Sequence, residues 1–326
     1  MNPDFRVCII GAGNLSSNRI YPYIGAAGGR LVGCCDLNTE RAERNARRFG
    51  GQAYTDWERM LDDQRPDGVI VCIGPRAHAE LAPRVLAKGY PCYTEKPPAP
   101  TASEALGVAR AAKAAGLLCT TAFKKRYNIA YSRARQWLEG FPPEDRYSLS
   151  IDYASAAYSE DPASTAFLHD FALHVLDLTG YLFGEIRRVF AFAKGGQAYA
   201  VSVEFACGAV GALNLTDGRS FTLPTEEVEL TLRGGNFMTI HNSSIWRITE
   251  NGKAAEWREP PTFVAGGDSG RETGHLAEIE DFFAAVREGR TTRSNIYESY
   301  KSLVFFEGVL ESVRTGRVVE LAYEPL

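Results

Sequence analysis

The sequence lacks the features that mark several classes of protein. No apolar run is long enough to span a bilayer, and the formal net charge of −4 offers no general attraction for nucleic acid or an anionic membrane. Residues 1–6 lack the charged-then-apolar plan of a signal peptide, and no internal repeat or low-complexity tract follows. We therefore expect a cytoplasmic protein with no nucleic-acid partner and no membrane partner.

Cysteine pairs with the spacing of metal or redox sites are also missing. The sequence has seven cysteines, an odd number, and no CxxC motif. Most of them lie inside apolar, strand-like runs, where a free cysteine behaves as a small buried hydrophobe. We expect reduced cysteines and no metal site.

The first third of the chain alternates between strand and helix signals. Short runs, the middle one apolar throughout, predict strands at 6–10, 31–35, 69–73, 90–93 and 117–121. Helical patterns fall between them at 38–49, 55–63, 76–88 and 101–115. Capping signals support three of these helices: Asn38, Thr55 with Glu58, and Thr101 with Glu104. Repeated units of this kind predict a parallel, doubly wound sheet.

The pattern changes after residue 122. Apolar and polar residues alternate along 146–153, 199–205 and 228–232, which is typical of an antiparallel sheet with one covered face. Two helices are predicted afterwards, at 271–289 and 296–315. We predict an α/β protein with two domains, 1–122 and 123–326, the second built on an open, mostly antiparallel sheet. Its exposed face favours a homo-oligomer, either a dimer or a tetramer.

A glycine-rich loop follows the first predicted strand, with the sequence Gly11-Ala12-Gly13-Asn14-Leu15-Ser16-Ser17. Gly11 would permit a tight turn, Gly13 would let the backbone approach a pyrophosphate, and Asn14 and Leu15 would open a helix facing the anion. Ser16 stands in place of the third glycine of the G-x-G-x-x-G fingerprint, at a position that governs helix packing. The alternative is that the glycines only shape a turn.

An acidic residue at the end of the second strand supports a dinucleotide site. Asp36 lies 36 − 11 = 25 residues after the first glycine, near the place where an acid binds the adenosine ribose. Leu37 and Asn38 offer no cation for a 2′-phosphate, and the carboxylate would repel one, so NAD is favoured over NADP. Arg41, one helical turn along, weakens that preference. The alternative for Asp36 is that it merely starts the next helix.

Two charged residues close a further buried strand. Glu95 and Lys96 follow the run at 90–93, and Pro97 prevents the strand from continuing. The charges must then lie at the carboxyl edge of the sheet, where open α/β folds bind their ligands. Lys96 is therefore a candidate catalytic residue, with a simple ion pair to Glu95 as the alternative.

A second group of polar residues lies on a predicted helix, 167–177. At about 100° per residue, Asp170 and His174 are about 40° apart and Asp177 falls near them, which gives one polar stripe. His169 lies about 140° from His174 on this wheel, so the two histidines do not share a metal. The alternative is a buried, satisfied His174 and an Asp170 that only favours the helix N-terminus.

Taken together, these motifs resemble the Gfo/Idh/MocA family, the relatives of glucose-fructose oxidoreductase and inositol dehydrogenase. The pattern D-x-G-x-H-x-x-D is met at Asp170, His174 and Asp177, with Ala172 in place of the glycine. The resemblance covers nearly the whole chain. It includes Pro75 and His78 after the third predicted strand, and the basic-aromatic segment 124–127.

The resemblance implies a Rossmann domain that binds NAD or NADP at 1–122, a domain for substrate and oligomerisation at 123–326, and a substrate cleft. It implies catalytic roles for Lys96, Asp170 and His174 and a cis Lys96-Pro97 bond. The cofactor would contact Gly11, Gly13, Asn14, Leu15, Asp36, Pro75, His78, Glu95 and Lys96. The substrate, a sugar or polyol, would contact Lys96, Arg126, Asp170 and His174.

The implied reaction moves hydride between nicotinamide and a hydroxyl or keto carbon of a sugar, a cyclitol or a derivative. His174 would accept the hydroxyl proton, Lys96 would donate to the reacting oxygen, and Asp170 would orient them. Lys124, Lys125 and Arg126 would bind an anionic substrate group, or else form a solvated turn. Two other functions remain open: a catalytically silent nucleotide sensor, and a glycoside hydrolase that uses NAD.

Overall fold

The computed structural model describes residues 4–156, 161, 164–259 and 269–326. The chain forms two compact units. The first contains residues 1–124, 274–300 and 326, and the second contains 125–273 and 301–325. The domain boundary at 122/123 stays a prediction, but the return of 274–300 to the first unit was not foreseen from the sequence.

The first unit is built on a parallel, six-stranded sheet with the order β3-β2-β1-β4-β5-β6. Its strands are β1 (Phe5–Ile10), β2 (Gly29–Cys35), β3 (Gln52–Tyr54), β4 (Gly68–Val71), β5 (Cys92–Thr94) and β6 (Cys119–Thr121). The predicted doubly wound sheet is confirmed. Sequence reasoning missed β3, because three residues are too few to show a period.

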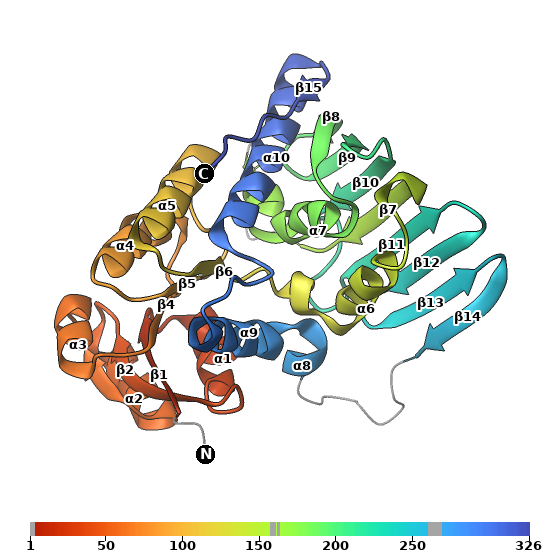
Figure 1. Ribbon diagram of the computed structural model, residues 1–326. Coiled ribbons are helices and arrows are strands. Elements are labelled where there is room, and N and C mark those ends of the chain that lie inside the picture. Colours follow the sequence, from red (N-terminus) through yellow and green to blue (C-terminus); the bar gives the residue numbers. More distant parts are fainter. Residues whose placement is uncertain (1–3, 157–160, 162–163, 260–268) are drawn as a thin grey trace. The chain divides into compact units, whose positions relative to one another are not determined.

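Helices cover both faces of this sheet (Figure 1). One face packs against the residues that flank α1 (Asn14–Arg19) and against the short η1 (Tyr21–Tyr23), α2 (Thr39–Phe49) and α9 (His275–Glu288). The other packs against α3 (Trp57–Gln64), α4 (Pro75–Ala87) and α5 (Ala102–Ala115). On the first face the ring of Phe5 stacks on Phe283 of α9, with centroids 4.3 Å apart. The late segment 274–300 thus completes the core of the first unit.

The capping signals were right at two helices and wrong at one. The side chains of Asn38 and Thr101 accept hydrogen bonds from the first turns of α2 and α5, as predicted. Helix α3 is capped by Asp56 and not by Thr55. The Asp56 carboxylate accepts from two backbone N–H groups, those of Glu58 and Arg59, so it satisfies more of the open helix end than a hydroxyl would.

The second unit is built on a nine-stranded sheet with the order β14-β13-β12-β11-β7-β10-β9-β8-β15. Neighbouring strands are antiparallel, except that β7 and β10 run parallel. The strands are β7 (Arg146–Ala154), β8 (Ile186–Lys194), β9 (Ala198–Phe205), β10 (Val210–Thr216), β11 (Thr225–Leu232), β12 (Asn236–His241), β13 (Ile245–Glu250), β14 (Lys253–Arg258) and β15 (Val319–Glu320). The predicted mostly antiparallel sheet is confirmed.

The helical elements of this part of the chain are η2 (Lys124–Tyr127), α6 (Ile129–Leu138), η3 (Pro143–Asp145), the π-helical η4 (Phe167–Ala172), α7 (Leu173–Phe183), α8 (Ser269–Thr273) and α10 (Ile296–Thr315). The single helix predicted at 271–289 is wrong. Gly274, with φ of 96°, divides it into α8 and α9, because a left-handed residue cannot continue an α-helix. None of the described helices is long and apolar enough to cross a bilayer.

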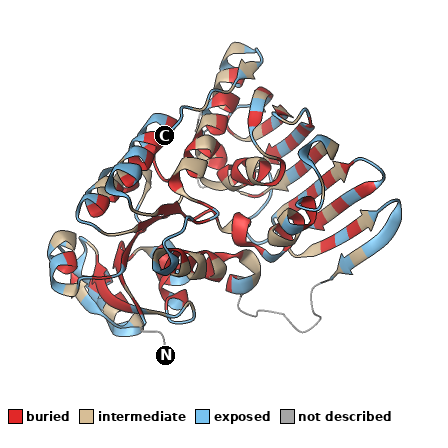
Figure 2. Cartoon of the chain, in the orientation of Figure 1, coloured by how far each residue is buried: buried red, intermediate tan, exposed pale blue. Residues whose placement is uncertain are grey.

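The nine-stranded sheet has one apolar face and one polar face. Side chains such as Leu149, Ile151 and Val201 are buried. Helix α7 contacts β7 of this sheet (Figure 1). The alternate positions are exposed, and several in the centre are small: Ser150, Ala212 and Ser202 lie side by side in register, and Ala200 lies two residues from Ser202 on β9. Figure 2 shows this alternation as stripes along the strands.

Candidate nucleotide and catalytic site

The glycine-rich loop fits the requirements of a phosphate-binding turn. Gly11 has φ of 109°, and a Cβ placed on it would lie 2.0 Å from the carbonyl oxygen of Cys72, so only glycine can stand there. A Cβ on Gly13 would meet nothing within 4 Å. The backbone at Gly13 therefore faces open space at the start of α1, as close approach by a dinucleotide requires.

The remaining loop residues divide into a packed and an exposed group. Ser16 is buried, and its hydroxyl donates to the Gly13 carbonyl oxygen at 3.1 Å. This agrees with the prediction that its position governs helix packing. Asn14 and Leu15 are exposed, Leu15 to 45%, and so remain accessible to a ligand.

The Asp36 carboxylate is fixed against the glycine loop. It accepts hydrogen bonds from the N–H groups of Ala12, at 2.8 Å, and Asn38, at 2.9 Å. Leu37, the next residue, is uncharged and 93% exposed. Sequence reasoning missed Arg44, which donates to the Ala12 carbonyl oxygen at 3.2 Å. Its place three residues after Arg41 on α2 was the available signal.

His78 joins two loops at the same edge of the sheet. Its Nε2 accepts the Ile73 N–H at 3.1 Å, which assigns the proton to Nδ1, and Nδ1 donates to the Pro97 carbonyl oxygen at 2.8 Å. Burial lowers the pKa of His78 to about 4, so the ring is neutral near pH 7. Pro75 begins the helix that carries His78. A direct cofactor contact by either residue stays a prediction.

Lys96 lies where the sequence placed it, just beyond the carboxyl end of β5. The Lys96-Pro97 peptide is cis, as predicted from the family resemblance. Lys96 is half-buried, and its backbone N–H donates to the carboxylate of the buried Glu95 at 2.7 Å. Burial raises the pKa of Glu95, while the charge of Lys96 opposes that rise.

The second group of predicted residues spans a change of helix type. Residues 167–172 form a π-helical turn, and α7 continues from it. The wheel drawn at 100° per residue is wrong over this turn, because a π-helix bonds i to i+5 and turns less per residue. Asp170 and His174 are half-buried, and His169 Nδ1 lies 3.5 Å from Asp170 Oδ1. A π turn inside a helix is frequent at functional sites.

Asp177, the third member of the predicted stripe, forms a buried ion pair. Arg126 donates Nε to Asp177 Oδ2 at 2.9 Å and Nη2 to Oδ1 at 2.8 Å. The Ser302 hydroxyl donates to the same carboxylate at 2.7 Å, and the Tyr181 ring lies 5.1 Å from the guanidinium. The side chains of Arg126 and Asp177 are 4% and 0% exposed. A substrate contact by Arg126 stays a prediction.

Lys125 is also buried in an ion pair, with Glu226 on β11. Tyr131 and Ser243 donate hydroxyl hydrogen bonds to the same carboxylate, and the Lys125 charge lowers the pKa of Glu226 against its burial. The solvated basic turn considered for this segment is therefore wrong for Lys125 and Arg126. The sequence could not show these pairs, since each partner is at least 50 residues away.

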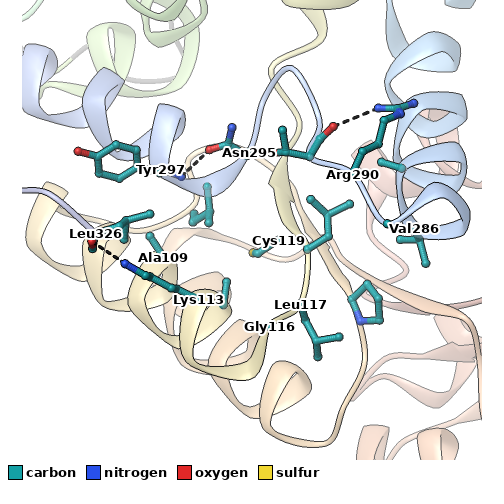
Figure 3. A pocket seen from close by; sticks show the side chains of 17 residues that line it. Ala109, Lys113, Gly116, Leu117, Cys119, Val286, Arg290, Asn295, Tyr297 and Leu326 are labelled. Atoms are coloured by element: carbon teal, nitrogen blue, oxygen red, sulfur yellow. Dashed lines mark hydrogen bonds between the residues drawn. The ribbon is translucent and has the colours of Figure 1, made fainter.

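A cavity of about 400 Å³ in the first unit holds none of the predicted site residues (Figure 3). Pro91 and Leu117, which precede β5 and β6, line it, so it lies at the amino edge of the sheet. Lys113 in its wall donates to the carbonyl oxygen of Leu326 at 2.7 Å. The predicted residues of the first unit gather at the opposite, carboxyl edge.

Two family descriptions match this chain. "Oxidoreductase family, NAD-binding Rossmann fold" matches residues 5–123, and "Oxidoreductase family, C-terminal alpha/beta domain" matches residues 160–321. Together they cover most of the sequence. The first includes the glycine loop, Asp36 and Lys96, and the second includes Asp170, His174 and Asp177.

Known relatives align along nearly the full chain. Inositol 2-dehydrogenase of Acidothermus cellulolyticus is 25% identical over 96% of this chain and 94% of its own. D-apiose dehydrogenase of Paraburkholderia graminis is 21% identical over 97% and 90%. A structure of levoglucosan dehydrogenase with NADH and levoglucosan superposes with a TM-score of 0.83 at 22% identity, covering 98% of this chain and 99% of that one, which shows a shared fold. The chain belongs to the Gfo/Idh/MocA oxidoreductase family.

Proposed function

We propose that the protein is an NAD-dependent oxidoreductase that interconverts a hydroxyl and a keto group on a sugar, a cyclitol or a derivative. One observation carries the proposal: the Gly11-Gly13 loop, the Asp36 carboxylate and Lys96 lie at the carboxyl edge of one parallel sheet. Relatives named as inositol and D-apiose dehydrogenases support the class of substrate.

The residues at this edge suit NAD in particular. The cofactor, when bound, accepts or supplies the hydride. Gly11 and Gly13 would let the backbone approach its pyrophosphate, and Asp36, held by two backbone N–H groups, would accept hydrogen bonds from the adenosine ribose. The fixed carboxylate would repel the 2′-phosphate of NADP.

Proton transfer requires groups that the protein itself provides. We assign His174 as the acceptor of the hydroxyl proton, since neutral imidazole can accept and return a proton near pH 7. Lys96 would donate to the reacting oxygen as negative charge develops on it, and Asp170 would orient its partner. Arg126 acts through Asp177 by holding α7, the helix that carries His174.

The open face of the nine-stranded sheet supports a homo-oligomer, either a dimer or a tetramer. Its centre is made of small side chains, with exposed Phe192 and Trp257, each 69% exposed, toward the outer strands. Small side chains would let a second copy approach closely, and the exposed aromatic residues would supply apolar area to bury. All seven cysteines are free, six of them buried, which supports a reducing compartment such as the cytoplasm.

A spectrophotometric screen tests the proposed reaction. The protein, with NAD and a panel of inositols, aldoses and sugar acids, should form NADH with at least one compound, and Lys96→Met should abolish most of that rate. The exposed Lys88→Met is the matched control. Tightly retained NAD with redox-neutral turnover would instead indicate a hydrolase, and NAD binding without any turnover would indicate a sensor.

A further inference from the structure

A second buried glutamate lies in the first unit, on α9. Glu278 is 2% exposed, and neither of its carboxylate oxygens has a hydrogen-bond partner in the described part of the chain. The hydroxyl of Tyr93, on β5, is buried and equally without a partner. The two groups nevertheless interact, since the Tyr93 hydroxyl lowers the pKa of Glu278 against the effect of its burial. Buried polar groups left in this state require an explanation.

Glu95 is buried to a similar degree but has a donor that Glu278 lacks. Its carboxylate accepts the Lys96 N–H at 2.7 Å, and the charges of Lys96 and Lys124 favour its ionised form. A buried carboxylate without an N–H donor or a paired cation is expensive to ionise. The geometry therefore favours an anion at Glu95 and a neutral acid at Glu278.

The electrostatic environment agrees with this division. Burial raises the pKa of Glu278 well above its usual value, and the negative charge of Glu95 raises it further, while Tyr93 and Lys124 oppose the rise. One helical turn away, His275 is neutral, because burial, with Lys124 and Arg19, lowers its pKa to about 2. Cys72 and Lys96 are the other ionisable groups that face Glu95 or Tyr93.

We propose that Glu278 is a positioning residue for the Glu95-Lys96 segment and acts in its protonated form. A neutral acid can donate to the Tyr93 hydroxyl; the ring of Tyr93, two residues before Glu95, packs against Phe282 of α9 with centroids 5.7 Å apart. A neutral Glu278 also leaves Glu95 as the only anion of the two glutamates. A second anion would repel the Glu95 carboxylate, which accepts the Lys96 N–H at 2.7 Å, and would so displace the backbone that carries Lys96. The part played by Lys96 rests on the proposed function.

The protonation of Glu278 can be tested without any substrate. Its folded-state pKa lies above the unfolded value of 4.5, so the stability that it contributes is full below pH 4.5 and is lost as pH rises toward the folded pKa. Glutamine has the shape of the neutral acid and does not titrate. Glu278→Gln should therefore raise Tm relative to the parent by several degrees at pH 8, and this gain should vanish near pH 4.5.

Glu280→Gln, on the same helix but not fully buried, is the control and should show no such trend. A Glu278→Gln variant that is equally or less stable than the parent at pH 8 would overturn the inference. So would a gain that does not change with pH.

Activity tests the positioning role. Glu278→Ala should lower kcat about tenfold with little change in KM for NAD. Glu278→Gln should retain most of the parent kcat. Glu95→Gln, which removes the carboxylate itself, should lose most of the parent kcat. If Glu278→Gln lowers kcat as much as Glu95→Gln does, the inference fails while the proposed function stands. If Lys96→Met keeps normal turnover, the proposed function fails, and the Tm comparison still decides the protonation of Glu278. Should Glu278→Ala not fold, the glutamine variant alone decides both points.

Discussion

The two sheets of this protein expose different parts of themselves. Strands β1 and β4 of the parallel sheet are buried on both faces, whereas the strands of the nine-stranded sheet alternate between buried and exposed residues (Figure 2). The first sheet can therefore meet a ligand only at its edges, and its charged residues lie at the carboxyl edge. The nine-stranded sheet has one face whose side chains are exposed and can contact another molecule. From this comparison we expect chemistry at the edge of the first sheet and assembly on the open face of the second.

The largest change in the stability of the second unit should come from Asp177, which is buried on α7. Asp177→Asn should lower the free energy of unfolding by about 3–5 kcal/mol, because the Arg126 guanidinium would remain buried without its counter-charge. Urea denaturation measures this loss. The exposed pair of Arg47 and Glu43 is the control, and Glu43→Gln should cost less than about 1 kcal/mol. Equal losses in the two variants would contradict the prediction.

Catalysis should depend on one residue from each unit. Lys96→Met and His174→Ala should each lower kcat about a hundredfold or more, the usual cost of losing one acid-base or oxyanion-stabilising group. Steady-state kinetics with a verified substrate measures both. NAD affinity should hardly change in His174→Ala, and the double variant should lose less than the product of the single effects. Near-normal turnover in both single variants would make these residues structural.

Cofactor choice should depend on Asp36 at the carboxyl edge. NAD should bind at least tenfold more tightly than NADP, a difference of about 1.4 kcal/mol, because the fixed carboxylate repels a 2′-phosphate. Calorimetric titration measures the two affinities, and Asp36→Ala should narrow the gap. Arg44 and Arg41 on α2 are the nearby cations, so tighter binding of NADP would show that they outweigh the carboxylate.

A substitution on the open face of the nine-stranded sheet should change the stability of the fold least. It should nevertheless change the mass of the oligomer greatly. Ala200→Arg, at the exposed centre of β9, should alter the unfolding free energy of a protomer by about 0.5 kcal/mol or less. Light scattering should nevertheless show an oligomer in the parent and a smaller species in the variant. Arg47→Glu, a change of charge on the exposed surface of α2, is the control and should leave the mass unchanged. A parent that is strictly monomeric at micromolar concentration would refute the oligomer.

Sequence patterns predicted the features that local chemistry determines. The apolar strands, the glycine loop with Asp36, and Glu95-Lys96 at a strand end all follow from short segments, and the structure shows these segments as expected. The family resemblance added the cis Lys96-Pro97 bond. The capping box predicted at Thr55 was wrong because Asp56, the next residue, is also a capping residue and caps α3 instead.

Features that join distant segments could not be predicted. The burial of Arg126 depends on Asp177, and that of Lys125 on Glu226, and no spacing in the sequence links these partners. The position of Glu278 depends on the return of α9 to the first unit. The π turn at 167–172 inserts into a helix whose apolar pattern reads as an ordinary α-helix.

The return of α9 also sets an order of events during synthesis. A ribosome that has reached residue 124 has made all six parallel strands but not the helix that covers Phe5, Ile9 and their neighbours (Figure 1). About 160 further residues must be translated before Phe282 and Phe283 exist, and at about 5–20 residues per second this takes on the order of ten seconds. Through that interval the part of this face that α9 covers stays open, within reach of chaperones and of other nascent chains.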